Sequence, residues 1–516
     1  MLSQDRPTAS DSAIALGFIV ALGMILAVVL GSWIAEEKWF PLGITLSIAI
    51  GTTLILSLGS NWWILIPWMS ALGFSTLVPG FSLTGVDAAA LLGFVIIGFR
   101  RAIGDLKPAQ PPLRLNWIFF AVIFYVVVHA ITAILQQYYA GETQLKNVVK
   151  AYYQIAAPLL LLWLLALYAK PASVKPAVLG ILLISAPTFL VGCTLVYLQS
   201  DLALLSHPYF NFDWAGASAF GYIRWSSIGL LLLALCLSTA TRSGLLKTVC
   251  FLTATLALLG AFLGGGRVAF ASCLLGIILW AGLRRNHLPL ILTAALGVAV
   301  FVAINADPRV LQDLPKTIQR SLTPFVVFNQ QTGEQRATEV SDRWHEDLRS
   351  ESWNYWMETP LSITVGHGYK GWNDSIDLKT FTEGPLYESA KKTAIQVGRT
   401  ERTFSSILVI FGAIGILLYY GLMLSLIRRL WKLRRLSPND SFPRAMCEFS
   451  LCMILIGLFT AFHAGGVPGY GMVYWFLGLL TARNITPLKA SIHATLERRA
   501  PELTPVLGSV PRTRTI

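Results

Sequence analysis

Long apolar stretches alternate with short polar connections along most of the chain, and their lengths predict membrane-spanning helices. A helix needs about 20 apolar residues to cross the hydrocarbon core of a bilayer. Charged residues, Gly or Pro bound fourteen such runs: 12–34, 39–58, 61–79, 84–99, 116–138, 148–169, 176–199, 219–241, 245–263, 267–283, 288–304, 403–427, 442–464 and 468–482. The third, fourth, tenth and fourteenth are short enough to be re-entrant or tilted, so we expect about 12–14 spans.

A single polar block, from Asp307 to Arg402, interrupts this pattern. Within it the sequence from Asp342 to Thr359 predicts a helix with a partly apolar face, ended by Pro360. Long polar segments held by a scaffold often carry function. We therefore divide the chain into a first helical bundle (1–304), a large loop (305–402), the last spans (403–484) and a basic tail (485–516).

Composition agrees with the pattern. Hydrophobic residues make up 55% of the chain and charged residues 13%, and the mean hydropathy is +0.62. Soluble domains carry roughly 25% charged residues. The sequence therefore predicts an all-α polytopic membrane protein.

The charge distribution indicates how the spans are oriented. The net charge is +13, but the polar block holds 12 Lys/Arg and 14 Asp/Glu, which leaves the basic excess to short connections and tails. That distribution is typical of a topology signal and disfavours nucleic-acid binding. With fourteen spans and a cytoplasmic N-terminus, all strongly basic connections fall on the cytoplasmic side, namely 100–114, 170–175, 242–247, 284–285, 428–435 and the tail. The polar block then lies outside, with the connections before spans 219–241 and 267–283.

Several classes of site have no support in the sequence. The six cysteines fall in or beside apolar runs, which is typical of packed core residues and gives no Cys-based metal site. His345-Glu346 does not continue as a two-histidine zinc motif, because Arg349 stands where the second histidine is needed. No phosphate-binding Gly-x-x-x-x-Gly-Lys motif occurs. We expect no metal, nucleotide or NAD cofactor.

Two arginines are candidates for binding an anion. Gly264, Gly265 and Gly266 precede Arg267 at the start of a span, where backbone N–H groups and the helix dipole favour negative charge. The alternative is an interfacial turn with a snorkelling arginine. Arg224 stands near the apolar layer before span 219–241 and needs a partner. It either contributes to an anion site, anchors the interface or pairs with Asp213.

The polar block offers further candidates. His367 lies between Gly366 and Gly368 beside Tyr369, which predicts a flexible loop presenting an imidazole, with aromatic rings suited to sugar stacking. The alternative is a solvated surface histidine. Glu401 and Arg402 lead into span 403–427 and are either functional or simply salt-bridged residues beside the membrane.

These residues resemble the O-antigen ligase and polymerase superfamily of bacterial envelope glycosyltransferases. Gly-Gly-Gly-Arg267 is similar to the Ser/Gly-x-Arg-Gly pattern of that family, and the loop helix ending at Pro360 before Gly366 and Gly368 is similar to its loop motif. Phe404-Ser405-Ser406-Ile407, running into Gly412-Ala413-Ile414-Gly415, is similar to the helix that follows that loop. The layout agrees over most of the chain, and the motifs cover about residues 220–420.

One departure from the family concerns its ligase histidine. Counting back eleven residues from Gly412 gives Glu401, followed by Arg402, where ligases carry a histidine. Either Glu401 takes that role, His367 supplies an imidazole, or the chain is not a ligase. Arg343 and Arg349 both fit the loop arginine of the family.

The resemblance implies a reaction on the outer face of the bacterial inner membrane. The donor is a glycan linked to a polyprenyl diphosphate such as undecaprenyl diphosphate, and an acceptor hydroxyl displaces the diphosphate without nucleotide or metal. Arg267 and Arg224, with Gly265 and Gly266, would bind the diphosphate, and Glu401 or His367 would act as the base. Chain-length regulators or flippases are expected partners in making lipopolysaccharide or exopolysaccharide.

The leading hypothesis is a polymerase, and the alternative is a ligase that transfers glycan to lipid A core or another acceptor. A secondary transporter would also be polytopic, but transporters place ionisable residues within spans. Here Glu448 is the main residue of that kind. A non-catalytic, flippase-like or assembly role is a further alternative.

Overall fold

The computed structural model describes residues 57–71, 76–78, 81–83, 85–102, 115–139, 145–170, 173–197, 206–207, 210–211, 217–264, 267–306, 314, 318–319, 322, 326, 333–369, 391–392, 394–396, 403–462 and 478. The chain forms two compact units, residues 1–62 and 63–516, and nearly all described residues belong to the second. The predicted span 12–34, nearly all of the spans 39–58 and 468–482, and the tail 485–516 lie outside the described residues.

The protein is an all-α polytopic membrane protein, as predicted. Eight helices in the described ranges are long and apolar enough to cross a membrane: α5 (Trp117–Tyr139), α6 (Leu145–Tyr168), α7 (Val174–Tyr197), α9 (Gly244–Leu263), α10 (Arg267–Arg284), α11 (Leu288–Ala306), α17 (Thr403–Leu436) and α18 (Phe442–Thr460). In α8 (Ala217–Ala240) the apolar part is shorter, Ser226–Ala240. Helix α4 (Gly85–Ala102) covers the predicted fourth span.

The predicted third span, 61–79, is not a single helix. A 3₁₀ helix η1 (Gly59–Ile64) leads into a short helix α3 (Leu65–Ala71), and Thr76–Val78 forms strand β1, which pairs with β2 (Phe81–Leu83). Pro79-Gly80 stands between these strands and is a turn-forming pair that a helix does not tolerate. A second two-stranded ladder joins β3 (Ser206–His207) to β4 (Phe210–Asn211).

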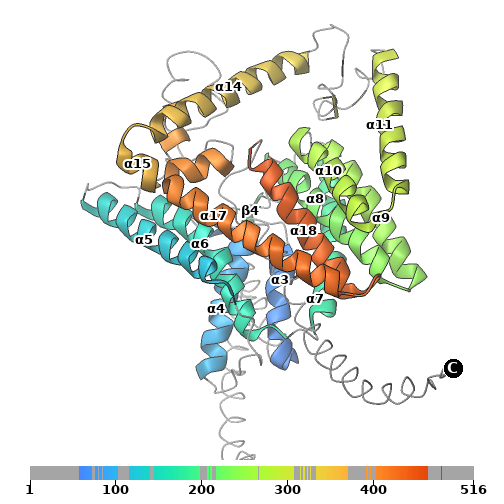
Figure 1. Cartoon of the computed structure of the whole chain (residues 1–516), viewed down its shortest axis with the longest axis horizontal. Coiled ribbons are helices and arrows are strands. Elements are labelled where there is room, and N and C mark those ends of the chain that lie inside the picture. Colours follow the sequence, from blue (N-terminus) through green and yellow to red (C-terminus); the bar gives the residue numbers. More distant parts are fainter. Residues whose placement is uncertain are drawn as a thin grey trace, which may run out of the picture. The chain divides into compact units, whose positions relative to one another are not determined.

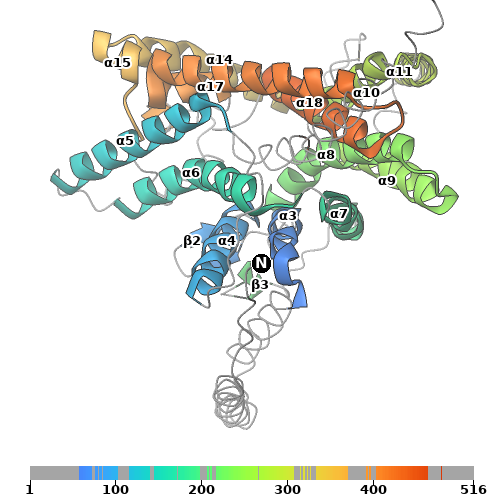
Figure 2. The ribbon, with the colours of Figure 1, turned by 60° about the horizontal axis from the view of Figure 1, so that its bottom comes forward.

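The helices of the second unit pack as a connected bundle (Figure 1). Helix α8 contacts α7, α9, α10 and α18, and α17 contacts α18 and α5. Two helices of the polar block, α14 (Gly333–Trp356) and α15 (Pro360–Val365), pack on α17 (Figure 2). The predicted helix over 342–359 is therefore present, but it begins nine residues earlier, at Gly333, and ends at Trp356. Pro360 is the first residue of the next helix, α15. Thr359 caps that helix by accepting from the Ser362 N–H at 3.0 Å.

One buried carboxylate joins several helix ends. Glu448 of α18 is fully buried, and its Oε1 lies 3.0 Å from the Nε atoms of Arg434 and Arg444. Its Oε2 contacts Arg284, the last residue of α10, which also donates to Thr239 at the end of α8. The ends of α8, α10 and α17 and the start of α18 therefore meet in one place. All six cysteines are free and buried, as expected.

This arrangement supports part of the predicted topology. The turns after α8, α10 and α17 carry Arg242, Arg285 and the basic end of α17, and they were predicted to share one side of the membrane. The cluster around Glu448 brings those turns together at one end of the bundle. That this end faces the cytoplasm stays a prediction.

We expect Glu448→Gln to destabilise the bundle strongly. The change leaves three arginines facing a neutral group, and removing one partner of a buried ion pair costs about 3–5 kcal/mol. Thermal unfolding of the purified protein in detergent measures the loss. Asp440→Asn is the matched control, because Asp440 also binds Arg284, at 2.9 Å, but its side chain is 76% exposed. Equal melting temperatures for Glu448→Gln and wild type would contradict this structural role.

Candidate functional site

Arg267 binds the polar block directly. It is the first residue of α10, and its Nη1 donates to Oδ2 of Asp342 on α14 at 3.0 Å, while its Nη2 donates to Oδ1. The Arg267 side chain is 28% exposed and that of Asp342 is 54% exposed. The guanidinium therefore holds two oxygens of one anionic group in the bidentate geometry that also suits phosphate. The end of α10 that was predicted to bind an anion is paired with a carboxylate of the chain itself, and binding of an external anion there stays a prediction.

Arg224 lies at the same turn. Its Nε and Nη2 donate to the Gly264 carbonyl at 3.1 and 3.0 Å. Gly264 caps the C-terminal end of α9, where helix carbonyls lack intrahelical partners. A Cβ added to Gly264 would lie 3.2 Å from the Arg224 backbone, so α8 and α9 approach closely here. Arg224 thus fixes the turn that leads to Arg267, whereas Gly265, Gly266 and Asp213 lie outside the described residues.

A second meeting point of loop and bundle is a break in α17. Gly412 has φ 61° and ψ −164° inside this helix, and such a break frees the carbonyls of the preceding turn. The N–H groups of His367 and Gly368 donate to the carbonyls of Val409 and Ile410 at 2.7 and 3.1 Å. The Tyr125 hydroxyl of α5 donates to the Phe411 carbonyl at 2.9 Å. The loop and α5 together pair the backbone groups that the break exposes.

Two glycines make this contact possible. Gly366 has φ 80°, and a Cβ there would lie 2.4 Å from the Ile410 carbonyl oxygen. A Cβ on Gly412 would lie 2.5 Å from the Gly366 nitrogen. Both positions combine a left-handed backbone with a backbone-to-backbone approach that any side chain would block. We call this contact the glycine crossing.

The crossing fixes His367. Its Nε2 lies 2.6 Å from the Tyr355 carbonyl, and its ring stacks on the Tyr355 ring with centroids 3.9 Å apart. A carbonyl oxygen only accepts, so Nε2 carries the proton, and Nδ1 is the basic nitrogen of the neutral ring. The prediction of a flexible loop around His367 is wrong, since backbone and side chain are both held. Tyr369 is also held, its N–H donating to the Tyr152 hydroxyl at 3.1 Å.

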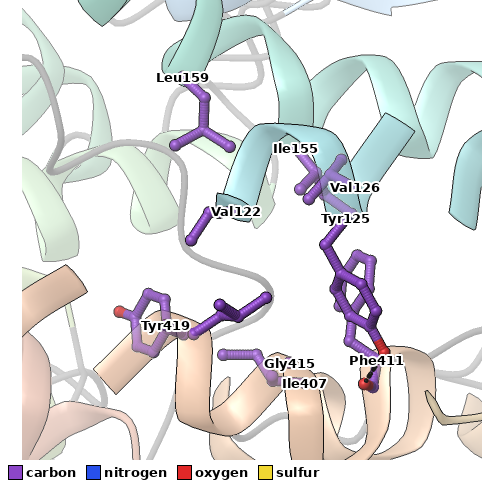
Figure 3. A pocket seen from close by; sticks show the side chains of 10 residues that line it. Val122, Tyr125, Val126, Ile155, Leu159, Ile407, Phe411, Gly415 and Tyr419 are labelled. Atoms are coloured by element: carbon purple, nitrogen blue, oxygen red, sulfur yellow. Dashed lines mark hydrogen bonds between the residues drawn. The ribbon is translucent and has the colours of Figure 1, made fainter. Parts of the chain in front are cut away.

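An apolar pocket adjoins the crossing (Figure 3). It is lined by side chains of α5, α6 and α17, and Tyr125 links it to the crossing through its bond to Phe411. The other lining residues include Val122, Ile155 and Tyr419. Nothing in this lining offers charge, so the pocket suits a hydrocarbon group and not a sugar or a phosphate.

The structure separates two of the predicted site residues. Asp342 binds Arg267, and the Tyr355 carbonyl binds His367. Asp342 and Tyr355 lie thirteen residues apart on α14. At a rise of 1.5 Å per residue this is about 20 Å. Reacting atoms must approach to about 3–3.5 Å. Arg267 and His367 therefore do not serve one reacting centre together in this arrangement.

Two of the remaining predicted residues lie on the surface of α14. Arg343 is exposed on α14, and Arg349 pairs on the helix surface with Glu346 at 3.2 Å. Glu401 and Arg402 lie outside the described residues. Among the described residues there is no group of three His, Cys, Asp or Glu able to hold a metal ion. Sequence reasoning missed Asp342 as a site residue, because no spacing links it to Arg267, 75 positions away.

No family model matches the chain, and no curated protein matches it. The site therefore has to be interpreted from its own geometry.

We expect Gly366→Ala to destabilise the protein and to release His367. The added methyl meets the Ile410 carbonyl, and a strained backbone at φ 80° costs about 1–3 kcal/mol. The melting temperature should fall, and proteolysis should cut the loop between α14 and α17 faster. Gly457→Ala in α18 is the control, since its Cβ would meet nothing within 4 Å. If Gly457→Ala lowered the melting temperature and Gly366→Ala left it unchanged, the proposed contact at the glycine crossing would be refuted.

Proposed function

We propose that the protein is a membrane glycosyltransferase that polymerises glycan repeats carried on a polyprenyl diphosphate, on the outer face of a bacterial inner membrane. The observation that carries the proposal is the bidentate contact of Arg267, at the start of a membrane helix, with a carboxylate of the large polar block. The two carboxylate oxygens stand in for two oxygens of the donor diphosphate.

The electrostatics of this place favour a leaving group that gains negative charge. Guanidinium stays charged and binds phosphate through a planar fork. The N-terminus of α10 adds its helix dipole. Arg224 holds the preceding turn through the Gly264 carbonyl, so the cation is fixed before the reaction begins. Fixed charges of this kind act where charge develops in the transition state.

The proposed reaction is a displacement at the anomeric carbon of the donor sugar. The acceptor hydroxyl oxygen forms the new bond, and the bond from the anomeric carbon to the diphosphate breaks with its electron pair passing to the diphosphate. A base takes the hydroxyl proton. The separation of about 20 Å along α14 disfavours His367 for that base, and Glu401, which lies outside the described residues, is the other candidate. Because the donor carries its own leaving group, the proposal needs no nucleotide.

His367 and Tyr369 then suit a different task. Their rings lie by the glycine crossing, with Tyr355 and Tyr152 beside them. Aromatic faces suit sugar stacking. We propose that this aromatic cluster binds the glycan chain, away from the place where the new glycosidic bond forms.

The pairing of Glu448 weighs against transport. A coupling residue must exchange its partner, but Glu448 is enclosed by three arginines from α10, α17 and α18. It is better explained as a structural centre. The ligase stays as the alternative enzyme, with lipid A core or another molecule as the acceptor.

The test is replacement of Arg267 in cells that make the polysaccharide. Arg267→Ala should lower polymer formation by about 10²–10³-fold, the usual loss on removing one charge-stabilising donor. Arg267→Lys should be intermediate, since it keeps the charge and loses the fork. Gel profiles of surface polysaccharide and the amount of single lipid-linked repeats measure the effect. Arg242→Ala, an exposed arginine in the connection between α8 and α9, is the control.

Wild-type polysaccharide in both Arg267 variants would overturn the proposal. Normal chain length with loss of attachment to lipid A would favour the ligase over the polymerase.

A further inference from the structure

The partner of Arg267 suggests how the site selects its ligand. An arginine at the outer end of a membrane helix lies near lipid headgroups, and anionic phospholipids bind basic residues at the bilayer surface. Each such headgroup offers one phosphate. A site meant for a diphosphate has to exclude this abundant competitor.

We propose that Asp342 is the specificity-determining residue of the anion site. Its carboxylate competes with single phosphate headgroups for Arg267 and prevents them from binding, whereas a diphosphate displaces it. This inference rests on the proposed function, because it takes the Arg267 fork as the diphosphate site. Asp342 accepts from both Nη atoms, so a lipid phosphate that uses this same pair of donors has to displace a group of equal charge. A diphosphate carries two phosphate groups, so it interacts more strongly with the guanidinium and displaces Asp342.

The exposure of the pair permits exchange. Arg267 is 28% and Asp342 is 54% exposed, and half-exposed ion pairs are weak. The pair at the other end of α10 is the opposite case, since Arg284 faces a Glu448 side chain that is fully buried. The same helix thus carries a permanent pair at one end and an exchangeable pair at the other.

Asp342 can leave the fork while α14 stays in place. Further along this helix, Leu348 is buried against Ala394, Ile395 and Val409. Glu351 pairs with Lys391 at 2.5 Å, and Tyr355 holds His367. Because these contacts anchor α14 to α17 and the loop, a rotation of the Asp342 side chain is enough to open the fork.

The experiment uses the full chain in nanodiscs of two compositions, phosphatidylcholine alone and phosphatidylcholine with phosphatidylglycerol. Farnesyl diphosphate is the probe, and its Kd is measured by calorimetry. Wild type should bind with nearly the same Kd in both. Asp342→Asn should bind roughly fivefold more tightly in phosphatidylcholine, because the internal competitor is gone. In nanodiscs that contain phosphatidylglycerol, the same variant should lose that gain and bind farnesyl diphosphate more weakly than wild type does.

Two further variants keep the result interpretable. Asp342→Glu retains the charge and should behave as wild type does. Glu346→Gln removes one exposed negative charge four residues along the same helix and should not make binding sensitive to phosphatidylglycerol. Melting temperatures confirm that each variant is folded.

Opposite results overturn different claims. An Asp342→Asn protein as insensitive to phosphatidylglycerol as wild type, or one that binds more weakly in both lipids, overturns the role of Asp342 and leaves the diphosphate site standing. Farnesyl diphosphate binding that Arg267→Ala does not weaken overturns the proposed function itself.

Discussion

Helix α10 is held at both ends by pairing of arginine with carboxylate, and the surrounding structure depends on this constraint. Its 18 residues extend about 27 Å, close to the thickness of the hydrocarbon core. Arg284 at one end donates to Thr239 of α8 and pairs with the buried Glu448, which also binds Arg434 of α17 and Arg444 of α18. Arg267 at the other end joins Asp342 of the polar block. One end fixes the bundle, and the other connects it to the segment proposed to act on substrate.

The polar block is thereby attached to the bundle at two places. The pair of Arg267 and Asp342 holds one part of α14, and the glycine crossing holds the segment after α15. The crossing works because Gly412 interrupts α17 and leaves carbonyls that backbone N–H groups of the loop can pair. In a membrane-embedded helix such groups need a partner from within the protein. The chain therefore combines a buried backbone attachment at the crossing with a partly exposed ion pair at Arg267.

Hydropathy predicted the helices from α5 to α11 to within about three residues at each end, because long apolar runs leave few other choices in a membrane. It failed at 61–79, where a short helix and strand β1 take the place of a single span. Charge predicted that the connections before α8 and α10 share one side of the membrane, but it did not predict that Arg224 binds the Gly264 carbonyl at the end of α9. The sequence did not point to Asp342 as the neighbour of Arg267, nor to the fixed position of His367, because both depend on contacts between distant segments. Glu401 and Arg402 stay predictions.

The most direct test of the account is a cryo-EM structure of the protein in nanodiscs with a bound polyprenyl diphosphate. We expect density for the diphosphate on the Nη atoms of Arg267, with the Asp342 carboxylate displaced and α14 still anchored at Leu348 and His367. A diphosphate bound elsewhere, with the contact between Arg267 and Asp342 intact, would contradict it.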